Sequence, residues 1–64
     1  MVKVPKNVLE RLKAVRSLGM VNMLDISGVT RCAEKPGFVE AAGWIREHQN
    51  RYRDGVFAGF EAEP

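Results

Sequence analysis

The chain has 64 residues, and its ten Lys and Arg side chains against eight Asp and Glu leave a net charge of +2. Hydrophobic residues make up 45% of the chain and charged residues 28%, a balance that is typical of a folded domain and argues against disorder. A charge so near to neutral lacks the concentrated basic excess of most nucleic-acid-binding domains. The length predicts one domain over residues 1–64 with a small core.

Cysteine content and hydropathy indicate where in the cell the protein is expected to be. The single cysteine, Cys32, cannot form a disulfide within the chain, and a lone thiol suits a reducing environment. No apolar run approaches the ~20 residues that cross a bilayer, and the first residues lack the charged-then-apolar order of a signal peptide. We therefore expect a cytoplasmic protein that has no membrane partner.

The first predicted helix covers residues 5–18. Pro5 suits the first helical turn, and Gly19 can end the helix in the left-handed conformation. Apolar side chains recur at helical spacing and form one stripe, made of Val8, Leu9, Leu12 and Val15. The basic residues of this segment fall on several sides of the helix, which predicts solvated charges; they are Lys6, Arg11, Lys13 and Arg16.

A connector rich in apolar residues follows, and then a second predicted helix over residues 26–35. Either Asp25 or Ser27 can cap its first turn, because both side chains accept hydrogen bonds from free backbone N–H groups. Lys35 and the Pro36-Gly37 pair indicate where this helix ends.

The third predicted helix is the longest and covers residues 38–54, with Gly55 as its expected end. The remaining apolar tail contains Val56, Phe57 and Phe60, and is expected to form either an extended segment folded over the core or a flap that orders on binding. The sequence thus predicts an all-α fold, a small three-helix domain with a short apolar C-terminal tail.

One order of residues resembles a known family. An Arg-x-x-Gly helix end, an Asn-Met-(Phe or Leu)-Asp turn, a Val-x-x-x-Ala helix, a Gly-Phe helix start and a late Tyr before a glycine succeed one another here. The matching positions are Arg16, Gly19, Asn22, Met23, Leu24, Asp25, Val29, Ala33, Gly37, Phe38, Tyr52 and Gly59. This order is similar to that of a family of small uncharacterised proteins found largely in phages and prophages, classed as a domain of unknown function. The resemblance implies a phage-associated origin, a bacterial host cytosol as location, and structural roles for these residues.

Catalytic and metal-binding residues are not expected. Cys32 and His48 are the only candidates for a nucleophile and base pair, but Cys32 falls on the apolar face of its predicted helix, where a thiol is usually inert. One cysteine, one histidine and scattered carboxylates match no pattern of metal ligands. We therefore expect no enzyme activity, cofactor or small-molecule substrate.

Two binding functions stay open. The preferred one is binding of a host or phage protein, with a homodimer as a further option, through the large apolar residues Trp44, Met20, Met23, Phe57 and Phe60. Inhibition of a bacterial defence system, as by an anti-CRISPR protein, is one concrete version of this role. The alternative is a helix-turn-helix regulator that contacts DNA through Arg46, Gln49, Asn50 and Arg53, although Glu40 near the start of that helix is unfavourable beside a polyanion.

Overall fold

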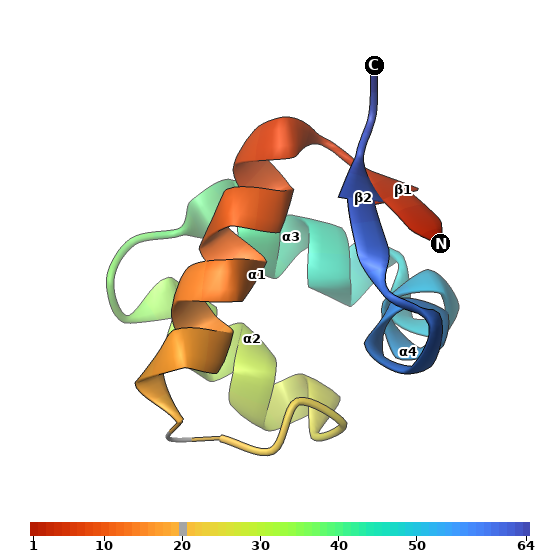
Figure 1. Ribbon diagram of the computed structural model, residues 1–64. Coiled ribbons are helices and arrows are strands. Elements are labelled where there is room, and N and C mark those ends of the chain that lie inside the picture. Colours follow the sequence, from red (N-terminus) through yellow and green to blue (C-terminus); the bar gives the residue numbers. More distant parts are fainter. Residues whose placement is uncertain (20) are drawn as a thin grey trace.

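The computed structural model describes residues 1–19 and 21–64. In chain order these residues form β1 (Val2–Val4), α1 (Lys6–Leu18), α2 (Ile26–Glu34), α3 (Val39–Glu47), α4 (Gln49–Ala58) and β2 (Phe60–Ala62). Figure 1 shows α1 in front of α3, α2 below them, and α4 with the two strands on the right. The fold is thus mostly helical, but the prediction of an all-α domain with three helices is wrong on two points.

The first difference is that the long helix predicted over residues 38–54 is divided in two. His48 has φ −129° and ψ 50°, which is not helical, and α4 leaves in a new direction from this residue. The imidazole turns back along α3: its ring stacks on Trp44 with a centroid distance of 5.0 Å, and Nδ1 lies 3.0 Å from the Trp44 carbonyl oxygen. Periodicity alone could not reveal this bend, because the apolar residues on both sides of it keep helical spacing.

The second difference is a two-stranded sheet that joins the ends of the chain. β1 and β2 pair in parallel, with Val2 opposite Phe60 and Val4 opposite Ala62. The backbone N–H of Glu63 also donates to the Val4 carbonyl oxygen at 2.8 Å. Of the two alternatives for the tail, the structure has the extended segment folded over the core, and Gly59, not Gly55, ends the preceding helix.

Local capping signals agree with the structure at the connector between α1 and α2. Gly19 ends α1 with φ 64°, the left-handed conformation that favours glycine. Of the two candidate caps for α2, Asp25 is the one used, and its carboxylate accepts a hydrogen bond from the Gly28 N–H at 3.1 Å. The connector is therefore bounded by the glycine that ends α1 and by the aspartate that caps α2.

The core lies where α1, α2 and α3 meet, and α4 and the strands close it from one side. Its fully buried members include Val4, Val15, Val29, Ile45 and Tyr52. Small side chains on α2 and α3 allow these two helices to approach closely; they are Ala33, Ala41 and Ala42. In the described part of the chain, none of the helices has the length and hydropathy needed to cross a bilayer.

Candidate functional site: an apolar pocket with a basic rim

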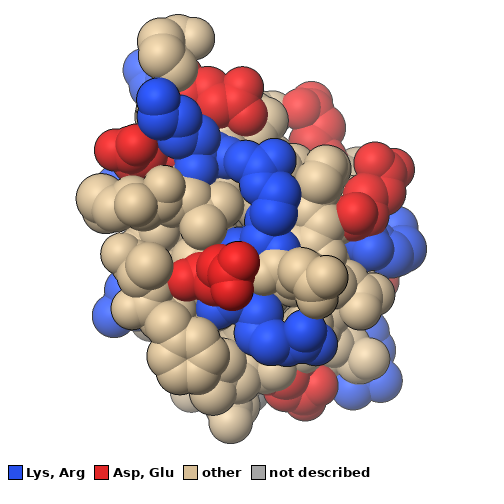
Figure 2. All heavy atoms as spheres, turned by 90° about the vertical axis from the view of Figure 1, so that its right-hand side faces the viewer, with Lys and Arg blue, Asp and Glu red and all other residues tan. Residues whose placement is uncertain are grey.

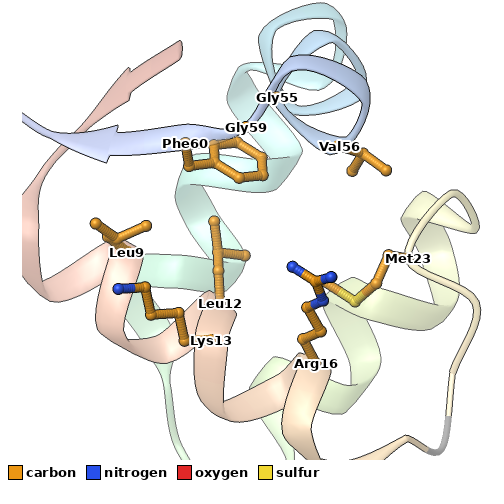
Figure 3. A pocket seen from close by; sticks show the side chains of 9 residues that line it. All are labelled: Leu9, Leu12, Lys13, Arg16, Met23, Gly55, Val56, Gly59 and Phe60. Carbon is orange, nitrogen blue, oxygen red and sulfur yellow. The ribbon is translucent and has the colours of Figure 1, made fainter. Parts of the chain in front are cut away.

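A surface pocket of about 270 Å³ opens between α1, the α1–α2 connector and the corner where α4 turns into β2. Figure 3 shows these three segments around it, with the Phe60 ring facing α1 across the pocket. The lining residues are Leu9, Leu12, Lys13, Arg16, Met23, Gly55, Val56, Gly59 and Phe60.

One stripe of α1 forms a whole wall of the pocket. Leu9, Leu12, Lys13 and Arg16 are spaced i, i+3, i+4 and i+7, so they share one face of the helix. Leu12 is only 3% exposed and belongs to the core as well as to the pocket floor. Lys13 and Arg16 extend from the same wall, and Figure 3 shows their nitrogen atoms beside the pocket. The wall therefore combines an apolar surface with positive charge.

The opposite wall depends on the close approach of Phe60 to α4. The Phe60 ring lies edge-on to Trp44, with centroids 6.3 Å apart, and 5.9 Å from the ring of Tyr52. Gly55 leaves room for the ring, because a Cβ atom at this position would overlap it. A glycine that sequence reasoning assigns to a helix end is therefore a packing residue inside α4.

This packing gives a prediction for Gly55→Ala. The added methyl group would force the Phe60 ring out of place, and overpacking of this kind costs about 1–3 kcal/mol of folding free energy. Gly43→Ala is the matched control, since a Cβ atom at Gly43 in α3 meets no atom within 4 Å. That control should be stabilising by about 0.5–1 kcal/mol, because alanine favours the helix interior. Urea unfolding of both variants tests the prediction, and equal effects would contradict it.

Met23, from the α1–α2 connector, forms the third side of the pocket, and a buried tyrosine holds its backbone in place. The Tyr52 hydroxyl donates to the Met23 carbonyl oxygen with an O–O distance of 2.5 Å. Asn22 supports the same turn, since its Oδ1 accepts a hydrogen bond from the Leu24 N–H at 2.9 Å. Burial raises the pKa of Tyr52 from 10.0 to about 12, because the ionised phenolate would lose its hydration. The raised pKa means that the phenol keeps its proton, and continues to donate, at a more alkaline pH than an exposed tyrosine would.

Of the residues predicted to bind protein, some line the pocket and others lie elsewhere in the structure. Met23 and Phe60 line the pocket together, and Phe57 is 77% exposed on α4, one residue beyond the pocket residue Val56. Trp44 belongs to the core: it is 8% exposed and is covered by His48 and Phe60. Met20 lies outside the described residues. The pocket thus unites two of the predicted residues with an α1 wall that the sequence-based prediction missed.

The residues predicted to contact DNA do not lie on one helix. Arg46 is on α3 and forms an ion pair with Glu34 at 2.9 Å, whereas Gln49, Asn50 and Arg53 follow the bend on α4. Arg53 donates to Asn50 Oδ1 at 3.3 Å. A second depression, of about 470 Å³, is lined by residues 46–51 and so keeps part of this set together.

The surface charge is mixed where these helices face solvent. The exposed face of α3 includes Glu40 and Glu47 besides Arg46. Figure 2 views the molecule from the side of α4 and the strands, and shows a broken band of basic side chains with acidic groups on both sides and within it. Negative groups in such positions oppose contact with a phosphate backbone. DNA contact stays a prediction.

The two candidates for nucleophilic chemistry lie on separate elements. Cys32 is half-buried on α2. His48 stacks on Trp44 at the α3–α4 bend, and its Nδ1 faces a carbonyl oxygen. Over residues 1–19 and 21–64, no three His, Cys, Asp or Glu side chains come together as metal ligands would.

Fold and pocket together define a small, mostly helical domain with an apolar surface pocket, in which Lys13 and Arg16 are the charged lining residues. The model of the family described as Domain of unknown function (DUF5049) matches residues 4–59. The chain therefore belongs to this family. No curated protein and no solved structure gives a significant match to it.

Proposed function

We propose that the protein is a non-enzymatic phage or prophage accessory protein that acts by binding a host or phage protein at the apolar pocket. The observation that supports this most is the pocket itself, where five large apolar side chains face a solvent-accessible space of about 270 Å³. Apolar pockets of this kind are where partner proteins insert their anchoring side chains. Phe57 is 77% exposed on the same helix, but it does not line the pocket.

The phage association is supported by the sequence resemblance, and the binding role by the geometry. Inhibition of a bacterial defence system, in the manner of an anti-CRISPR protein, is a concrete form of this proposal that fits a protein of 64 residues. A DNA-binding regulator is the second candidate. It has less support, because Glu40 and Glu47 lie on the exposed face of α3 and Arg46 is paired with Glu34.

Affinity capture from host lysate with a matched pair of variants tests the proposal. Met23→Gln places a polar side chain of similar size in the pocket wall, whereas Leu24→Gln changes the next residue, which is 45% exposed and does not line the pocket. We expect Met23→Gln to lower the recovery of the partner at least tenfold, and Leu24→Gln to leave it unchanged. Circular dichroism should show the same helicity for both variants.

Two results would contradict the proposal. One is a partner protein that both variants recover as well as the parent does, since the pocket would then have no part in binding. The other is recovery of nucleic acid, and not protein, by the parent and by both variants.

A further inference from the structure

The charged residues that line the pocket have a single sign. Lys13 and Arg16 are the only charged residues among those that line it, and both are positive. Within the part of the chain that the structure describes, the ion pair of Arg46 with Glu34 is the only one, so neither Lys13 nor Arg16 has a carboxylate of this chain at ion-pair distance. The two side chains are three residues apart on α1, which places them about one helical turn from each other.

The volume of the pocket limits what can enter it. A cavity of roughly 150 Å³ lined by apolar side chains is large enough for benzene. The pocket, at about 270 Å³, therefore accommodates one aromatic or leucine-sized side chain, but not an entire helix. Met23 gives the wall a flexible, polarisable side chain that can adapt to either shape.

We infer that the pocket recognises an acidic segment of a partner protein, with one large apolar side chain inserted between α1 and Phe60 and its neighbouring carboxylates placed beside Lys13 and Arg16. This inference rests on the proposed function and states the chemistry of the partner. Apolar burial supplies affinity, and the charges select the partner and speed the encounter. Because both basic side chains line the pocket that receives the inserted side chain, the carboxylates belong within about one helical turn of that side chain.

Three synthetic helical peptides serve as probes. The first has one Phe with Glu three and four residues away, the second has Lys in place of each Glu, and the third has Ala in place of Phe. Titrations are followed at low salt by NMR of the Leu9, Met23 and Val56 methyl groups. We expect the acidic Phe peptide to shift these signals, the basic peptide to bind at least tenfold more weakly, and the Ala peptide to leave the signals unshifted.

Charge reversal of the rim makes the test specific. In the double variant Lys13→Glu, Arg16→Glu, the order of affinities should invert, so that the basic Phe peptide binds more tightly than the acidic one. The control double variant is Lys6→Glu, Arg31→Glu, which changes the net charge equally at exposed residues outside the pocket and should keep the original order. Higher salt should reduce the preference in every case.

The inference is overturned if the acidic Phe peptide leaves the pocket signals unshifted, or if reversal of the rim does not invert the order. Equal inversion in the control double variant would overturn it too, because net charge alone would then explain the preference. The affinity capture that tests the proposed function depends on Met23, and its result does not require the bound segment to be acidic. If that capture persists while the inversion fails, the proposed function stands and only the chemistry assigned to the partner is wrong.

Discussion

Leu12→Ala is expected to lower the free energy of unfolding by about 2–5 kcal/mol, the usual cost of a cavity left by a buried leucine. Leu12 is 3% exposed and lies where α1 meets the core. The core of a domain of this length rarely supplies more than roughly 3–5 kcal/mol, so this loss should unfold much of the variant at 37 °C. Urea unfolding followed by circular dichroism measures the loss.

Leu18→Ala is the matched control for this prediction. Leu18 is in the same helix but is 57% exposed, so its truncation creates no cavity and should change stability by less than about 0.5 kcal/mol. If the two variants unfold at the same urea concentration, the packing of α1 against the core is not as described.

Alkaline pH is expected to destabilise the protein through Tyr52. The folded state holds the pKa of this phenol at about 12, above its ordinary value of 10.0, so the folded state retains the proton that the unfolded state loses. The resulting stability is complete below pH 10 and is lost as pH rises through 12. A difference of about two pKa units corresponds to roughly 2–3 kcal/mol.

Tyr52 is the only tyrosine of the chain, which makes this prediction direct to measure. The rise of tyrosinate absorbance reports the ionisation of this one side chain, and urea unfolding at a series of pH values reports the stability. Tyr52→Phe removes the titrating group, so its stability should fall less between pH 10 and 12 than that of the parent protein. An equal fall would mean that the loss of stability does not come from Tyr52.

Local signals in the sequence predict much of the helical part. The bounds of α1 and α2 depend on Pro5, Gly19 and Asp25, and each of these acts on the backbone within one turn of itself. The β1–β2 sheet could not be predicted in this way. Its partners are three residues long and pair across almost the entire chain, and no turn between them sets the register.

The pocket shows a similar division. Met23 and Phe60 attract attention as large apolar residues outside the helical stripes, and the structure brings them together. For Lys13 and Arg16 the helical pattern predicts only solvated charges, although their i, i+3 spacing next to Leu9 and Leu12 places all four residues on one side of the helix. The sequence does not show that the α4–β2 corner lies opposite them. The position of this corner depends on the bend at His48 and on the space that Gly55 leaves for the Phe60 ring.

The parallel pairing of the strands has a mechanical consequence. The chain enters β1 at Val2 and leaves β2 at Ala62, which lie at opposite ends of the pair. Tension applied to these two points pulls the strands past each other along their length, so the hydrogen bonds that join them are all loaded at the same time. Sliding of β2 would withdraw Phe60 from its place between Trp44 and Tyr52. A load on the two ends would therefore dismantle a wall of the pocket while the helices were still intact.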